Sequence, residues 1–122
     1  MKVKFWGVRG STATPEERNL RYGGNTSCIE VRLANGTLII LDCGTGMMAL
    51  GKNLMLEDGD RPIYAYIFLT HLHWDHIQGI PFFVPFYRPE NHFFFHSAMC
   101  SGAEIERSIS RQMASPYFPV DT

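Results

Sequence analysis

Several features that would define a class of function are scarce in this sequence of 122 residues. The 11 Lys and Arg residues are balanced by 12 Asp and Glu residues, so no basic excess exists to neutralise nucleic-acid phosphates over a broad surface. No apolar run approaches the about 20 residues of a membrane-spanning helix, and the longest, 63–69, has the length of a strand. The first five residues alternate polar and apolar side chains and contain no signal-peptide core. We therefore expect no membrane partner and no strong nucleic-acid footprint.

Cysteine is also scarce, with three residues that are far apart and form no CxxC pair. This pattern excludes a disulfide framework and a cysteine-based zinc module. Cys28 and Cys43 lie in apolar surroundings, which favours buried thiols in a reducing compartment. The expected location is the cytoplasm.

The hydrophobic pattern predicts strands separated by helical and polar segments. In the second strand, alternation places Ile29, Val31 and Leu33 toward the core and Glu30 and Arg32 toward solvent. The third strand is continuously apolar, which predicts a central strand that is covered on both faces. The expected strands are 2–9, 27–33, 37–41, 63–69 and 92–96.

Between these strands the sequence indicates two regular helices and several loops. The first helix follows the turn 43–46, and Ser101 with Glu104 forms a capping-box signature for the second. Residues 10–24 form a long polar loop, 77–89 is a short helix followed by irregular chain, and the tail 115–122 has no periodicity. The fold class is therefore α/β, with a mixed sheet.

One segment concentrates residues that bind metals. His71, His73, Asp75 and His76 lie within six positions directly after an apolar strand. In an extended chain His71 and His73 point to the same side, and a turn into a helix would aim Asp75 and His76 at the same cavity. Two imidazoles on one ion, and a carboxylate with an imidazole on a second, suit Zn²⁺ and also Mn²⁺ or Fe.

The remaining histidines, His92 and His96, are not expected to join this cluster. Three phenylalanines separate them, which favours a strand. Four residues of a strand span about 13 Å, which is too far for both rings to bind one ion. They are expected in the core or at its rim.

The motif H-x-H-x-D-H at 71–76 after an apolar strand resembles the metal-binding motif of the metallo-β-lactamase-fold hydrolases. Asp42-Cys43-Gly44-Thr45-Gly46 is similar to the aspartate and glycine turn of that family, and 24–28 with 6–11 is similar to its phosphodiesterase branch, which includes ribonuclease Z. Trp74 departs from the small residue that is usual at its position in ribonuclease Z. The resemblance extends along essentially the whole chain.

The resemblance implies an αββα sandwich and a binuclear metal site whose bridging hydroxide attacks phosphorus or a carbonyl carbon. By motif position, His71 and His73 would hold the first ion and Asp75 and His76 the second. The predicted catalytic residues are Asp75 and Asp42, of which Asp42 would orient the ligand loop by hydrogen bonds. A turn aspartate that caps the bend 44–46 is a compatible alternative for Asp42, and Asn25 and Thr45 are either site-lining residues or ordinary loop polar groups.

The family has two similar lobes, and further ligands come from the second. No histidine follows His96, and the only later aspartate is Asp121. We therefore expect residues 1–122 to be the N-terminal lobe alone, one half of the sandwich.

Two functions remain open. One is a metal-dependent hydrolase of a phosphodiester; the alternative is a non-catalytic truncated lobe that binds metal weakly and self-associates or needs a partner to complete the site. The expected partners are a small anionic or phosphodiester substrate and a second copy of the chain, bound through the uncovered lobe-facing surface as a homo-oligomer.

Overall fold

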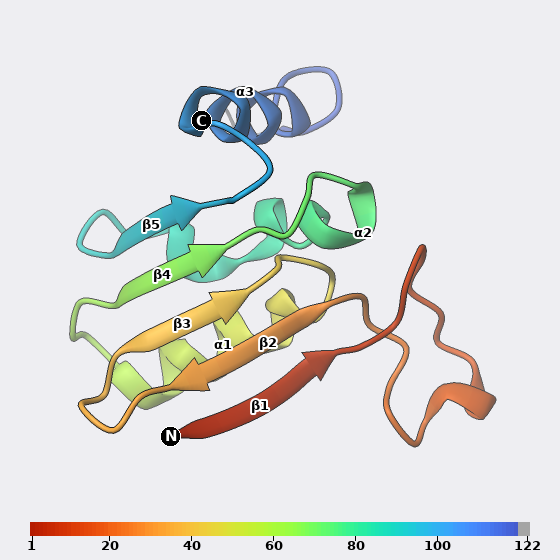
Figure 1. Cartoon of the computed structure of the whole chain (residues 1–122), viewed down its shortest axis with the longest axis horizontal. Coiled ribbons are helices and arrows are strands. Elements are labelled where there is room, and N and C mark those ends of the chain that lie inside the picture. The colour runs from red at the N-terminus through yellow and green to blue at the C-terminus, as the bar shows by residue number, and fades with distance from the viewer. Residues whose placement is uncertain (120–122) are drawn as a thin grey trace.

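The computed structural model describes residues 1–119 and contains one five-stranded sheet with the order β1-β2-β3-β4-β5 (Figure 1). Strands β1, β2 and β3 pair antiparallel, whereas β3, β4 and β5 pair parallel. The predicted mixed sheet is thus confirmed. The strands are Lys2–Gly7, Cys28–Arg32, Leu38–Leu41, Tyr64–Phe68 and His92–His96.

The helices cover one face of the sheet and one of its edges. Helix α1 and the 3₁₀ turns η2 and η3 lie behind the sheet in Figure 1, and α3 lies beyond the edge strand β5. The predicted capping box is present at the start of α3, because Ser101 accepts from the Glu104 backbone and the Glu104 carboxylate accepts from the Ser101 backbone. The helical segments are α1 Met47–Asp58, α2 Trp74–Ile77, α3 Gly102–Gln112, η1 Glu17–Asn19, η2 Ile80–Phe82 and η3 Val84–Tyr87.

The hydrophobic core lies between α1 and the sheet. Leu50 and Leu54 of α1 are fully buried, as are Ile40 of β3 and Ile67 of β4. Each such side chain contributes about 1.5–3 kcal/mol by leaving water. Phe83, between η2 and η3, is also fully buried and anchors the proline-rich segment against the core. This core fixes the carboxyl ends of β3 and β4, where the polar residues of the molecule gather.

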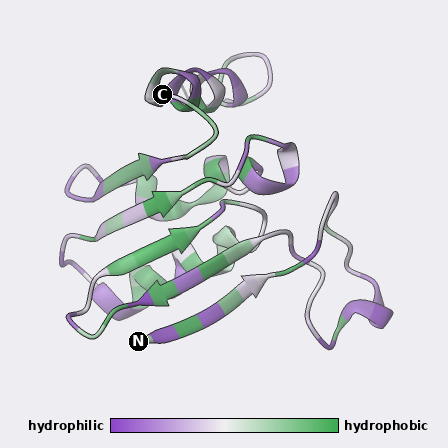
Figure 2. Ribbon diagram, in the orientation of Figure 1, coloured by the Kyte–Doolittle hydropathy of each residue, from purple (hydrophilic) through white to green (hydrophobic). Residues whose placement is uncertain are grey.

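The opposite face of the sheet is apolar and has no cover from residues 1–119. Tyr64, Tyr66 and Phe68 alternate along β4 and are exposed, and their partners on β5 continue the same surface, as with Tyr66 opposite Phe94. Figure 1 looks onto this face, and Figure 2 shows β3 as continuously hydrophobic. The prediction that 37–41 is covered on both faces is therefore wrong for the described residues: Ile39 is only half-buried.

The orientation predicted for the second strand is also wrong. Glu30 is buried, at 6% exposure, on the α1 side of the sheet, whereas Ile29 and Val31 face the uncovered side. The buried carboxylate accepts from the Trp6 indole at 3.0 Å and from Arg32 Nε at 2.9 Å. These bonds offset its desolvation. Periodicity identified the two faces of the strand but not which of them is covered.

The thiols agree with the expectation of small buried hydrophobes for two of the three cysteines. Cys28 and Cys43 are free and buried, and Cys100 is free and half-buried. Burial raises the pKa of the Cys28 thiol to about 12 and raises that of Cys43 as well. Neither thiol is therefore a reactive thiolate at neutral pH.

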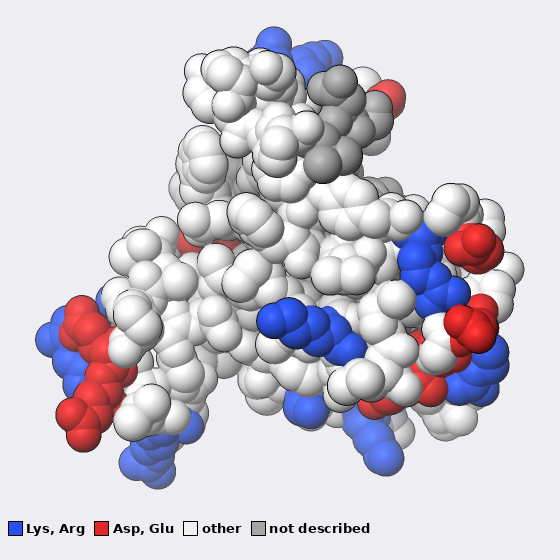
Figure 3. All heavy atoms as spheres, turned by 180° about the vertical axis from the view of Figure 1, so that it is seen from behind, with Lys and Arg blue, Asp and Glu red and all other residues white. Residues whose placement is uncertain are grey.

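The tail is irregular from residue 115 to residue 119; its last three positions, including Asp121, lie outside the described residues. Among those described, no helix has the length and apolar character needed to cross a membrane. On the α1 side of the molecule, Lys and Arg side chains lie both near the centre and at the margins, whereas Asp and Glu side chains lie mainly toward the margins (Figure 3).

Candidate metal centre

The candidate site lies at the carboxyl ends of β3 and β4. These strands are parallel neighbours with Leu41 opposite Phe68, so the residues that follow them emerge at the same edge of the sheet. Asp42 follows the first strand, and 70–76 follows the second. In open sheets with parallel strands, ligands bind preferentially at this edge.

Asp42 is a buried residue at the centre of a hydrogen-bond network. Its side chain is 4% exposed and its backbone has a positive φ of 61°, a conformation that aspartate tolerates better than most residues. One carboxylate oxygen accepts from the Thr70 backbone N–H at 2.8 Å. The other accepts from His76 Nδ1 at 2.8 Å and from the Thr70 hydroxyl at 2.9 Å. Asp42 therefore bonds directly to Thr70 and His76 of the segment that contains the candidate ligands.

This network orients two histidines. His76 donates from Nδ1 to the Asp42 carboxylate, and its Nε2 lies 3.3 Å from Asp75 Oδ2. The Thr70 hydroxyl donates to Asp42, so it accepts from His71 Nδ1 at 2.9 Å, and the neutral His71 ring then has its lone pair on Nε2. A hydrogen bond at one imidazole nitrogen is what commonly orients the other toward a metal.

The structure brings all four predicted ligands together. The His71 ring centroid lies 4.4 Å from that of His73 and 4.1 Å from that of His76. Asp75 Oδ2 lies 3.3 Å from His76 Nε2. The expected turn into a helix occurs, because His73 is the extended N-cap of α2, and Asp75 and His76 lie within the helix.

Asp75 has a further partner from the long polar loop. The Ser11 backbone N–H donates to Asp75 Oδ2 at 2.9 Å across 64 residues of sequence. This bond lowers the pKa of the Asp75 carboxyl, with a smaller contribution from the neighbouring His76. The group therefore remains a carboxylate, which is the form that binds a cation.

The types of donor in this cluster suit a metal ion, but their placement does not complete a metal site. Imidazole and carboxylate donors suit Zn²⁺. Within residues 1–119, however, no three His, Cys, Asp or Glu side chains are placed so that they could hold one ion. His76 is engaged on both ring nitrogens, by Asp42 and by Asp75. The cluster fits part of a metal centre rather than a closed one.

The turn after β3 packs directly on the backbone of the motif. Cys43 N–H donates to His76 O, and Gly79 N–H donates to Cys43 O, each at 2.8 Å. A Cβ atom on Gly44 would lie 2.4 Å from the Asp75 carbonyl oxygen and 2.4 Å from the Thr26 hydroxyl. Only glycine allows this approach. The glycine turn therefore fixes the position of α2, the short helix that contains Asp75 and His76 and is called the ligand helix below.

Sequence reasoning missed two positioning groups and left two others open. Thr70 carried a signal, a hydroxyl residue directly before the first histidine, whereas the Ser11 bond depends on a local φ of 68° that no pattern indicates. Thr45 donates to Asn25 Oδ1 at 3.0 Å and accepts from the Thr26 backbone at 2.9 Å. Asn25 and Thr45 therefore tie the loop to the glycine turn.

The non-candidate histidines lie on the uncovered face of the sheet. His92 stacks on Tyr64 with ring centroids 5.1 Å apart, and His96 stacks on Phe68 at 5.2 Å. Both are exposed, so they occupy the rim that the sequence allowed.

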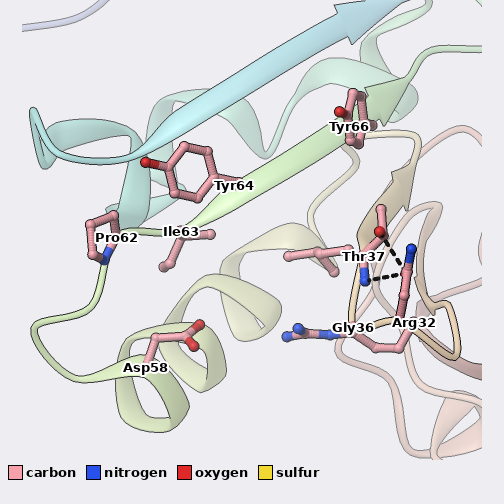
Figure 4. A pocket seen from close by; sticks show the side chains of 10 residues that line it. Arg32, Gly36, Thr37, Asp58, Pro62, Ile63, Tyr64 and Tyr66 are labelled. Atoms are coloured by element: carbon pink, nitrogen blue, oxygen red, sulfur yellow. Dashed lines mark hydrogen bonds between the residues drawn. The ribbon is translucent and has the colours of Figure 1, made fainter.

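A second hollow lies at the opposite end of the sheet (Figure 4). It has a volume of about 510 Å³, and its charged lining residues are Arg32 and Asp58. Arg32 Nη2 lies 3.2 Å from Glu57, and Asp58 lies 3.6 Å from Arg61. These two charges are therefore already paired within the fold.

Residues 21–90 match the family model of the Metallo-beta-lactamase superfamily. This match covers more than half of the chain and includes both the glycine turn and the histidine motif. The chain therefore belongs to the metallo-beta-lactamase superfamily, and the mixed sheet with its helices is a partial form of that fold.

Similar proteins indicate the branch of the superfamily to which the chain is related. The chain is 30% identical over 123 aligned positions to a ribonuclease Z of Haloarcula marismortui and 28% identical to one of Natronomonas pharaonis, each alignment covering 98% of the chain and 36% of the relative. A ribonuclease Z of Methanothermobacter thermautotrophicus is 37% identical over 82 residues, 66% of the chain and 23% of the relative. The chain thus spans about a third of the length of the first two relatives. No solved structure matches.

These relatives correct the prediction about partners. Each is named a ribonuclease, an enzyme of RNA. The expectation of a small anionic or phosphodiester substrate with no strong nucleic-acid footprint is therefore wrong. Net charge averages over all 122 residues, so it does not show whether cationic groups gather at one site.

Proposed function

We propose that this chain carries half of the active site of a metal-dependent phosphodiesterase that acts on RNA. The observation that supports it most is the clustering of three imidazoles and a carboxylate at the carboxyl end of the sheet, where the Asp42–Thr70 network bonds two of the imidazoles. The ribonuclease Z relatives favour RNA as the substrate.

The roles of the residues follow from their donors. His71 and His73 would hold one ion, and Asp75 and His76 a second, with Zn²⁺ as the expected metal and Mn²⁺ or Fe as alternatives. A bound metal would lower the pKa of water and stabilise the charge that develops on phosphorus. Asp42 would orient His76, and Thr70 would orient His71, each through a hydrogen bond at Nδ1.

The domain assignment is part of this proposal. A zinc ion in a catalytic site usually has three protein ligands, and these residues offer two for each ion. The sheet also has an apolar face without cover from residues 1–119. Both observations favour residues 1–122 as the N-terminal lobe of a two-lobed domain. The expected cytoplasmic location, which rests on the free thiols, stays a prediction.

The alternative is a non-catalytic lobe that binds metal weakly and needs further residues to complete the site. The absence of any three convergent donors among residues 1–119 favours it. Metal binding without turnover would distinguish this lobe from the phosphodiesterase.

The test is metal affinity, followed by hydrolysis. The chain is purified without chelator, and Zn²⁺ affinity is measured by competition with a chromogenic chelator for the wild type, His73→Ala and the control His92→Ala. Both histidines are exposed, so neither variant should lose its fold. We expect His73→Ala to weaken binding at least about tenfold and His92→Ala to leave it unchanged. Equal affinities in all three proteins would refute the metal assignment.

Hydrolysis is then assayed with bis-(p-nitrophenyl) phosphate and a short RNA. Metal-dependent turnover that is lost in His73→Ala supports the phosphodiesterase. Binding that is lost in the same variant, without turnover in the wild type, supports the incomplete lobe.

A further inference from the structure

A hollow beside the ligand helix has no role in the site described above. It has a volume of about 420 Å³, within the range of small-ligand pockets, and lies between α2 and the end of α3. Its lining residues are Trp74, Ile77, Ser108, Arg111, Gln112 and Tyr117.

The walls of this hollow are held by specific contacts. Gln112 Nε2 donates to the Ile77 carbonyl at 3.1 Å, which ties the end of α3 to α2. The Tyr117 backbone N–H donates to Ala114 O at 2.9 Å. Phe118 packs edge-on against Phe82, with ring centroids 5.8 Å apart. The hollow is therefore a fixed part of the fold.

Two aromatic side chains at the hollow are unusually exposed. Trp74 is 72% exposed and Tyr117 is 83% exposed, whereas Ile77 beneath them is 8% exposed. Large aromatic rings gain most when they are covered, and rings that stay open beside a polar site provide a platform on which a planar group can stack. Stacking on such rings is how proteins hold bases of single-stranded nucleic acids.

A cation completes the hollow. Arg111 lies in the last turn of α3. None of the ion pairs among residues 1–119 includes Arg111, so no acidic side chain of this part of the chain neutralises it. A guanidinium binds two phosphate oxygens at once and also stacks on planar rings. An apolar ligand would not need this charge, and inorganic phosphate would not need the two rings.

We infer that this hollow binds the nucleotide adjacent to the reacting phosphodiester, with its base on Trp74 and Tyr117 and its phosphate on Arg111. Trp74 lies between His73 and Asp75 in the sequence and shares α2 with Asp75 and His76, so the helix that carries two of the candidate ligands also carries the proposed stacking ring. This inference rests on the proposed function and adds the subsite that would select nucleotides.

The test uses the whole chain with EDTA, so that binding is measured without metal and without turnover. Adenosine 5′-monophosphate is the probe, and ribose 5-phosphate is the matched compound without a base. The two tryptophans of the chain give separate indole N–H signals in an NMR titration. The Trp6 indole is bonded to Glu30 at 3.0 Å and serves as an internal reference.

We expect adenosine 5′-monophosphate to shift the Trp74 indole and leave that of Trp6 in place. Ribose 5-phosphate should bind at least about fivefold more weakly, because stacking contributes that much or more. Trp74→Leu should weaken nucleotide binding by a similar factor, Trp74→Phe should retain most of it, and Tyr64→Leu, at the other end of the sheet, should have no effect. Arg111→Gln should weaken the nucleotide and ribose 5-phosphate alike.

Equal affinity for the two compounds, or unchanged nucleotide binding in Trp74→Leu, would overturn the subsite. Because EDTA is present throughout, that failure is separate from a failure of metal binding in the His73→Ala experiment. If the chain bound the nucleotide but no metal, the nucleotide subsite would stand and the proposed metal-dependent function would be rejected.

Discussion

The two ends of the sheet both contain a polar hollow or cluster, but their charges are arranged differently. At the amino end of β4 the Arg32 and Asp58 charges are paired with residues of the fold itself. At the carboxyl end, Asp42 holds His76 directly by Nδ1, and Thr70, itself bonded to Asp42, holds His71 by Nδ1. Polar residues at the first end are paired with one another, whereas those at the second gather the residues of the proposed metal centre.

Gly44→Ala should have the largest effect and should break the carboxyl end. The added Cβ would lie 2.4 Å from the Asp75 carbonyl oxygen, so the turn and the ligand helix must separate. We expect the free energy of unfolding to fall by about 3 kcal/mol, the upper part of the range for overpacking, as measured by urea denaturation.

Gly102→Ala is the matched control for this substitution. Nothing lies within 4 Å of a Cβ at Gly102, which is the first residue of α3, and alanine should be neutral or stabilise the protein by up to about 1 kcal/mol. Equal stability of the two variants would contradict close packing at Gly44.

Arg32→Met should destabilise the protein without affecting the binding end. It leaves the buried Glu30 carboxylate with the Trp6 indole as its remaining partner, which should cost about 2 kcal/mol. Zinc affinity, measured by chelator competition, should stay within about twofold of wild type. A tenfold loss of affinity would show that the two ends are coupled.

Thr70→Val should have a smaller effect on stability but a clear one on binding. It removes the hydroxyl that joins Asp42 to His71, which should cost about 1 kcal/mol in stability and about tenfold in zinc affinity. Thr70→Ser keeps the hydroxyl and should restore most of both. If serine were as poor as valine, the hydroxyl would not orient His71.

The pH dependence of Asp75 should give the smallest effect. The Ser11 bond lowers its pKa below the ordinary value of 3.8 in the folded chain. The stabilisation that the ionised Asp75 gives to the folded chain is therefore fully present above pH 3.8. It is lost as pH falls through the lower pKa of the folded state. The difference in unfolding free energy between wild type and Asp75→Asn should shrink below pH 3.8, as followed by urea titrations at several pH values. A constant difference would exclude this role of Ser11.

Much of the carboxyl end was predictable because its signals are local. The histidine motif follows a strand, and Asp42 precedes a glycine turn, so strand ends and ligand residues coincide in the sequence. Ser11 was not predictable, since its bond to Asp75 joins residues 64 positions apart. The side on which Glu30 is buried was also not predictable, because it depends on the Trp6 and Arg32 partners. Alternation separates the two faces of a strand but does not show which face is covered by the rest of the protein.

The buried Asp42 carboxylate has a consequence for the energetics of binding. Because folding already fixes the rings of His71 and His76 through this group and Thr70, their rotational freedom is lost before a ligand arrives. Ordering a side chain at the moment of binding costs about 0.5–1.5 kcal/mol, and here folding has met that cost for both rings. The free energy of folding therefore includes the entropy cost of ordering these two rings, and a ligand that binds them does not have to supply it.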